Sequence, residues 1–240
     1  MASLSYYKSL LLTGSRDQHI FLRDTRTPNL YNQQFQGPSQ EVCGIKWSPS
    51  GEYFACGSND NTMMVFSPKT NLAIMKKRHK AAVKALAWSP NHNGLLATGG
   101  GTMDCRIRLW NVKKQKLINE TDTGSQVCSI MFSKHENELI SSHGFSTNEV
   151  SVWRGSKLKK IKSLMGHTQR VLYLAMSPDG NLVVSGAGDE TLRFWNLNYS
   201  QNENEKTQGT MFNLFDLQTK NNKPQPYKSK LKKFHMPVLR

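Results

Sequence analysis

The 240-residue chain has little that would support catalysis, secretion or membrane insertion. Its four cysteines show no C-x-x-C spacing, which argues against zinc and redox motifs and predicts an intracellular protein with reduced thiols. Its seven histidines have no metal-ligand spacing, so we expect no metal, no other cofactor and no small-molecule substrate. No run of 18 apolar residues predicts a membrane span. The first ten residues also lack the apolar core of a signal peptide.

Acidic residues are scarce as well. The chain has 17 of them against 32 Lys and Arg, for a net charge of +15. Lysines gather at 157–162, and residues 220–240 contain seven basic residues and no acid. Such runs either bind nucleic acid or form solvated linkers and sheet edges, where lysine discourages aggregation. No nucleic-acid-binding motif accompanies the charge, so we favour the solvated interpretation and expect no nucleic-acid partner.

What the chain does contain is a repeat, visible as two markers. One marker follows a first strand and reads Trp47-Ser48-Pro49, Trp88-Ser89-Pro90, Phe132-Ser133-Lys134 and Met176-Ser177-Pro178. The other ends a third strand and reads Arg23-Asp24, Val65-Phe66, Trp110-Asn111, Val152-Trp153 and Trp195-Asn196. The first marker recurs every 41 to 44 residues and the second every 42 to 45, the length of a four-stranded WD-repeat blade. An all-β sandwich with coincidental spacing is the alternative.

The repeats predict the following organisation. Residues 1–197 should form an all-β, WD-repeat β-propeller with five recognisable blades, and 198–240 a flexible basic tail with one apolar patch at Met211–Leu217. Each blade should have short strands separated by turn residues. In the first blade we expect an outer strand at Asn29–Phe35. Five blades should form an arc whose end edges do not meet, which leaves both edges exposed.

Three residues of the last repeat look like a hydrolase triad: His167, Ser185 and Asp189. No nucleophile elbow or oxyanion-hole sequence accompanies them. We predict instead that they form a buried hydrogen-bonded tetrad with Trp195, since polar groups are costly to bury unpaired. The glycines at 99–101 are not a phosphate loop, because no Lys-Ser/Thr follows and they lead into a strand. The chain is therefore not expected to be an enzyme.

The stretch from Gly166 to Asn196, GHTQRVLYLAMSPDGNLVVSGAGDETLRFWN, resembles the last blade of the fizzy and fizzy-related family. EVCGIKWSPSGEYFACGSNDN and SQVCSIMFSKHENELISSHGFSTNEVSVW are similar to other blades of that family, and the resemblance covers Ser3 to about Asn196. These proteins are WD-repeat activators of the anaphase-promoting complex. The resemblance implies a nuclear and cytoplasmic coactivator of this ubiquitin ligase. Its partners would be subunits of the complex and substrates bearing KEN-box or destruction-box degrons.

The resemblance also implies site residues. Those matching the KEN-box receptor surface are Asn59, Asn61, Thr102, Gln126 and Arg170. Glu190 matches one acid of the destruction-box site, and Leu239-Arg240 stands where the family has an Ile-Arg dipeptide that docks on the complex. The family has seven blades and this chain resembles it from the third, so we expect an N-terminally truncated member, which is a truncated gene product, a fragment or a divergent copy.

Two other functions remain open from the sequence. A generic WD-repeat scaffold would keep the fold without binding degrons. A basic, nucleic-acid-associated propeller would use the positive charge, with a steep dependence of affinity on salt.

Overall fold

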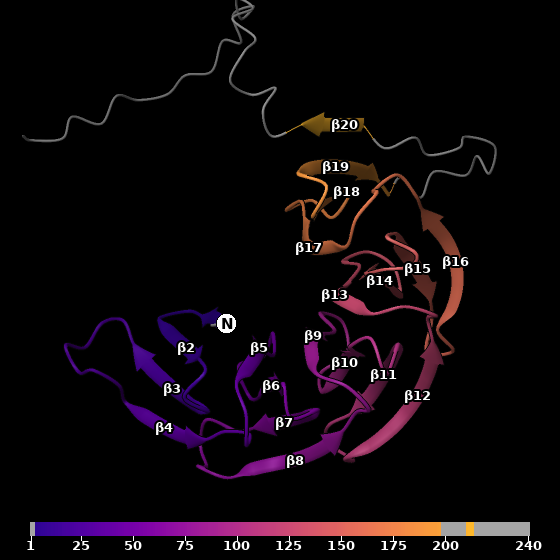
Figure 1. Ribbon diagram of the computed structural model, residues 1–240. Helices are drawn as coiled ribbons and strands as arrows, with labels where there is room; N and C mark the ends of the chain where they lie inside the picture. The colour runs from indigo at the N-terminus through magenta and orange to yellow at the C-terminus, as the bar shows by residue number, and fades with distance from the viewer. Residues whose placement is uncertain (1–2, 198–209, 214–240) are drawn as a thin grey trace, which may run out of the picture.

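The computed structural model describes residues 3–197 and 210–213, and this part of the chain folds into five antiparallel sheets of four strands each (Figure 1). In every sheet the strands pair in the order of the sequence. The first three sheets contain β1 (Ser3–Tyr7), β2 (Leu10–Gly14), β3 (His19–Asp24), β4 (Gln33–Gln36); β5 (Val42–Trp47), β6 (Phe54–Ser58), β7 (Thr62–Phe66), β8 (Ala73–Arg78); and β9 (Val83–Trp88), β10 (Leu95–Gly100), β11 (Arg106–Asn111), β12 (Lys116–Asp122). The last two contain β13 (Val127–Phe132), β14 (Glu138–His143), β15 (Val150–Arg154), β16 (Lys159–Leu164); and β17 (Val171–Met176), β18 (Leu182–Ala187), β19 (Thr191–Asn196), β20 (Thr210–Asn213).

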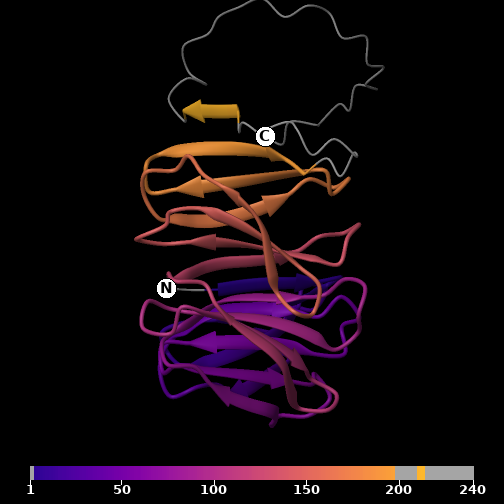
Figure 2. The ribbon, with the colours of Figure 1, turned by 90° about the vertical axis from the view of Figure 1, so that its right-hand side faces the viewer.

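The sheets follow one another around an arc. Figure 1 shows β5, β9, β13 and β17 on its concave side and β8, β12 and β16 along its outer rim. Seen from the side, the sheets are stacked face to face (Figure 2). Extensive contacts run from each sheet to the next along the sequence, mainly through the inner strands, and the first and last described sheets are not neighbours. The prediction of five propeller blades is confirmed, and the described residues form an open arc.

Burial along the strands follows from this stacking. Every position of β6 and β14 is buried, because another sheet packs on each of their faces. By contrast β17, in the last sheet, alternates between less and more exposed residues. Four hydrophobic clusters fill the four interfaces between consecutive sheets. Within the described ranges, no helix is long and apolar enough to cross a membrane.

Two predicted outer segments differ from the structure. The outer strand of the first sheet is Gln33–Gln36, not Asn29–Phe35, because residues 25–32 form the connection that leaves β3, with a turn in which the Thr27 N–H donates to the Asp24 carbonyl at 3.2 Å. The outer strand of the last sheet, β20, lies in the segment that the sequence assigns to the tail, within the predicted apolar patch and the residue before it. Among the described residues, the last sheet therefore includes Thr210–Asn213 as its fourth strand.

Glycine at one recurring position lets consecutive sheets approach closely. Gly14, Gly57 and Gly99 occupy the same place near the ends of β2, β6 and β10. A Cβ atom on Gly57 would lie 2.3 Å from the carbonyl oxygen of Val83 in the next sheet, and one on Gly99 would lie 2.4 Å from Val127 Cγ1. Both distances are far below van der Waals contact. The missing side chain therefore makes room for the inner strand of the following sheet.

This packing predicts that Gly57→Ala destabilises the protein. The atom in the way belongs to the backbone of Val83, so the two sheets must separate, at a cost of about 2 kcal/mol in free energy of unfolding. Urea unfolding followed by tryptophan fluorescence measures it. Gly186→Ala is the matched control, since Gly186 has the same place in β18 and its Cβ would meet only the flexible end of Leu192, at 3.2 Å. Equal losses in the two variants would contradict this explanation.

Candidate functional site

One end of the sheets, which we name the connecting face, is formed by two kinds of segment. The first kind is the turn between the second and third strands of a sheet, at 15–18, 59–61, 101–105, 144–149 and 188–190. The second is the connection from one sheet to the next, at 37–41, 79–82, 123–126 and 165–170. Hydrogen bonds join the two kinds of segment. Asp60 Oδ2, for example, accepts from the backbone N–H of Ser39, and Asn148 Nδ2 donates to the Thr168 carbonyl.

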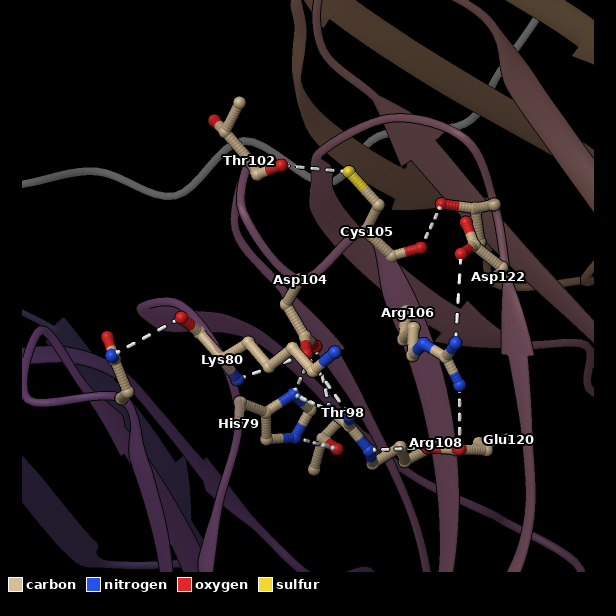
Figure 3. Close-up of polar contacts among 12 residues, drawn as sticks. His79, Lys80, Thr98, Thr102, Asp104, Cys105, Arg106, Arg108, Glu120 and Asp122 are labelled. Carbon is tan, nitrogen blue, oxygen red and sulfur yellow. Dashed lines mark hydrogen bonds and ion pairs between the residues drawn. The ribbon is translucent and has the colours of Figure 1, made fainter.

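Beneath this face in the third sheet lies a buried polar network (Figure 3). His79 Nδ1 is 2.8 Å from Asp104 Oδ2, and His79 Nε2 is 2.9 Å from Thr98 Oγ1. The indole N–H of Trp110 donates to the same Thr98 oxygen, at 2.9 Å. Arg108 adds two further hydrogen bonds to the Asp104 carboxylate, at 2.7 and 3.1 Å. The connection before the sheet, its central turn and its third strand are thereby tied together.

The charges of this network follow from burial and from its hydrogen bonds. Burial raises the pKa of the Asp104 carboxyl, but hydrogen bonds from His79 and Arg108 outweigh it and hold this pKa well below its ordinary range. Burial also lowers the pKa of His79, against the opposing hydrogen bond to Asp104. At neutral pH the network therefore consists of a carboxylate, a neutral imidazole and a guanidinium. The carboxylate is fully buried, so it depends on these partners.

The last sheet contains the four residues of the predicted tetrad. His167 Nδ1 is 2.9 Å from Asp189 Oδ2, and His167 Nε2 is 2.7 Å from Ser185 Oγ. The Trp195 indole donates to Ser185 Oγ at 2.8 Å. Ser185 is completely buried, so a substrate could not reach this hydroxyl. These contacts form a structural network, in which the Ser185 hydroxyl is already bonded to His167 and Trp195.

Sequence reasoning overlooked the corresponding networks of two other sheets. In the third sheet the connection reads Arg78-His79 and not Gly-His, so the Gly-His pair that identified the last repeat is missing there. In the fourth sheet the histidine lies at the end of β14: His143 Nε2 is 2.7 Å from Ser141 Oγ, which also accepts from Trp153. In both sheets the sequence does contain a signal for the network, because a Trp follows a Ser or Thr by twelve residues: Trp110 follows Thr98, and Trp153 follows Ser141.

All five residues matched to the KEN-box surface lie on the connecting face: Asn59, Asn61, Thr102, Gln126 and Arg170. Two of them are brought together by Gly144, since a Cβ there would lie 3.1 Å from Gln126 Oε1 and 3.5 Å from Arg170 Cδ. Asn61 reaches the next sheet through its Nδ2 atom, 3.5 Å from the Lys80 carbonyl. Thr102 is exposed at the tip of its turn, above Asp104 (Figure 3). The residues thus follow the face across consecutive sheets.

The remaining predicted site residues fall in two places. Glu190 is exposed in the turn before β19, next to a segment bonded to Arg170: the Gly188 N–H donates to the Arg170 carbonyl at 3.0 Å. Glu190 is therefore on the connecting face as well. Leu239 and Arg240 lie outside the described residues. Among the residues that are described, no group of three or more His, Cys, Asp or Glu could hold a metal ion.

Two exposed apolar residues of the connecting face were not predicted. Met103 is 80% exposed in the turn that also carries Thr102, and Phe145 is 78% exposed in the turn after Gly144. Each is the one large apolar residue in a turn of mostly small or polar residues, and this contrast in the sequence could have identified it as exposed. Exposed apolar residues in the same face as amides and an arginine give this face both apolar and polar groups.

The fold and the repeated buried networks define the class of protein: a WD-repeat β-propeller. Residues 1–195 match the family model of the CDC20/Fizzy WD40 domain. The chain therefore belongs to the CDC20/Fizzy family.

Individual relatives agree with this assignment. The chain is 49% identical to the B-type cell cycle switch protein ccs52A of Medicago truncatula over 198 residues, which cover 82% of the chain and 42% of that protein. It is 46% identical to the APC/C activator protein CDH1 of Saccharomyces cerevisiae, over 82% of the chain and 35% of that protein. A chain in the crystal structure of the mitotic checkpoint complex superimposes with a TM-score of 0.79 at 42% identity, over 81% of this chain and 60% of that one. The chain thus spans less than half the length of the two relatives.

Proposed function

We propose that the chain is a substrate-recognition coactivator of the anaphase-promoting complex, active in the nucleus and cytoplasm and without catalytic activity of its own. The observation that carries the proposal is the row of exposed and half-buried amide, hydroxyl and guanidinium groups on the connecting face of a CDC20/Fizzy propeller. The name of the yeast relative, an APC/C activator, supports it. The proposed partners are subunits of that complex and proteins that carry degrons.

The chemistry of the face suits a KEN-box peptide. Such a peptide presents a lysine, a glutamate and an asparagine in a row. Amide side chains such as Asn59 and Gln126 both donate and accept, so they can pair with the peptide asparagine and with its backbone. Arg170 can form a charge-assisted hydrogen bond with the peptide glutamate. Phe145 would cover the apolar part of the peptide.

Arg170→Ala tests this surface. A charge-assisted hydrogen bond contributes about 1.5–3 kcal/mol, so loss of Arg170 should weaken a fluorescein-labelled KEN peptide at least about tenfold in a fluorescence-polarisation titration. Arg16→Ala is the matched control, because Arg16 is also an exposed arginine in a turn of the connecting face but lies in the first sheet. Affinity unchanged by Arg170→Ala, or equally reduced by both substitutions, would remove the KEN-box assignment.

Two further parts of the proposal rest on matches of single positions. Glu190 is proposed as one acid of a destruction-box site, where it would accept hydrogen bonds from the arginine of the degron. Leu239 and Arg240 are proposed to dock on the complex through an apolar side chain, a guanidinium and a terminal carboxylate. Exchange of Ile for Leu changes branching and not volume, which is usually tolerated.

A further inference from the structure

A cavity opens between the third and fourth sheets at the end of the molecule opposite the connecting face. Its walls come from the turn between β9 and β10, the turn between β15 and β16, and the adjoining ends of β11, β13 and β14. Its volume is about 640 Å³, within the range of pockets that hold small ligands or peptide side chains. None of the residues proposed to bind degrons lines it.

The wall of this cavity contains a buried carboxylate with one unused oxygen. The side chain of Glu138 is only 2% exposed. Arg154, its partner across β14 and β15, directs both Nε and Nη2 to the same oxygen, Oε1, at 3.0 and 2.9 Å. The other oxygen, Oε2, is buried and has no hydrogen-bond partner among the described residues. A buried acceptor left unpaired is costly, so Oε2 is suited to a donor that comes from outside the chain.

The lining has the opposite charge bias to the rest of the protein. No lysine or arginine lines the cavity, although the chain has 32 of these residues against 17 acids. The only charged residue in the lining is Glu138, and the apolar residues Ile118, Phe132 and Leu158 supply much of the wall. Ile118 is 46% exposed, so part of this apolar surface can be reached from solvent. A positively charged group on an aliphatic stem complements such a wall.

We propose that this cavity binds a lysine or arginine side chain of a partner peptide. The ammonium or guanidinium would donate to Glu138 Oε2, and the methylene groups would pack against Ile118 and Leu158. Glu138 Oε1 is already occupied by Arg154, so the new contact uses one oxygen and does not require a bidentate arginine. The site would act independently of the connecting face, on the other side of the molecule.

The test uses the full chain and two pairs of small probes, measured by isothermal titration calorimetry. The charged probes are the n-butylamides of N-acetyl-lysine and N-acetyl-arginine, and the neutral ones are the corresponding norleucine and citrulline compounds. We expect a charged probe to bind at least about tenfold more tightly than its neutral counterpart, as a buried charge-assisted hydrogen bond requires. The two charged probes also separate a lysine site from an arginine site.

Two variants and one control place the binding in the cavity. Glu138→Gln keeps the shape and should reduce affinity for the charged probe about tenfold. Glu136→Gln, two residues away in an exposed position, should leave affinity unchanged. If Glu138→Gln lowers the melting temperature, Ile118→Ala in the exposed part of the wall is used in its place. We expect this variant to bind the charged probe a few-fold more weakly. Equal affinity for charged and neutral probes, or full affinity in folded Glu138→Gln and Ile118→Ala proteins, would overturn the proposal.

Discussion

Replacing Asp104 with alanine should lower the free energy of unfolding by about 3–5 kcal/mol, the cost of breaking a buried ion pair from one side. The carboxylate is fully buried and is bound by His79, by the backbone of Lys80 and by Arg108. Its removal leaves the largely buried Arg108 guanidinium without its closest acid and the Lys80 N–H without an acceptor. A typical domain is stable by about 5–15 kcal/mol in total, so this single substitution should remove a large share.

Urea unfolding of the variant and of two comparison proteins measures the effect. Asp122→Ala is the control: Asp122 is 60% exposed and lies 3.9 Å from Arg106, so its loss should cost at most about 1 kcal/mol. Asp104→Asn retains an oxygen for the Lys80 N–H but loses the charge, and should fall between the two. If Asp104→Ala and Asp122→Ala were equally stable, the buried network would not be the support that its geometry indicates.

Acid should destabilise the protein well before its carboxylates are protonated. Burial lowers the pKa of His143 to about 4, from an ordinary value of 6.5. The unfolded chain therefore binds a proton on this residue below pH 6.5, whereas the folded chain does so only near pH 4. The contribution is fully present above pH 6.5 and is lost as the pH falls from about 6.5 to about 4. The total is about 3 kcal/mol for His143 alone.

Other groups add to the same trend. Burial also lowers the pKa values of His79 and His167, so both act in the direction of His143. Below pH 4 the carboxyls of Asp60 and Asp189 also contribute. Burial raises their pKa values, but the hydrogen bonds that they accept have the larger effect and bring both pKa values down to about 2. Their contributions are present above their ordinary pKa of 3.8 and are lost as the pH falls toward 2.

Urea midpoints at pH 7.5, 5.5 and 4.5 test the role of His143. The free energy of unfolding of the wild type should fall steadily over this range, and that of His143→Gln should fall by about 2.5 kcal/mol less. His19→Gln, at an exposed position, is the comparison for the exchange of histidine for glutamine itself. An identical pH dependence in wild type and His143→Gln would show that protonation of this buried imidazole is not what unfolds the protein.

The sequence was most informative where a feature depends on neighbouring residues. The inner strands and the tetrad of the last sheet were predictable because Gly166-His167, Asp189 and Trp195-Asn196 lie in one repeat with regular spacing. Pairing of β20 was not predictable, since β20 carries neither of the two repeat markers and lies more than a dozen residues after the last of them in the sequence. The free oxygen of Glu138 could not be predicted either. It depends on which carboxylate oxygen accepts the hydrogen bonds of Arg154 and on how two sheets pack together. Neither can be predicted from residues that are close in the sequence.

The arrangement in which each described sheet contacts mainly its sequence neighbours has a consequence for how the protein folds. Few contacts join distant parts of the chain, so the loops that must close are about one repeat long and their entropic cost is modest. The stability of such a one-dimensional array is a sum of terms for single sheets and for adjacent pairs. The third sheet lies in the middle of the described array and contains a buried network of five side chains, so we expect order to spread from it in both directions.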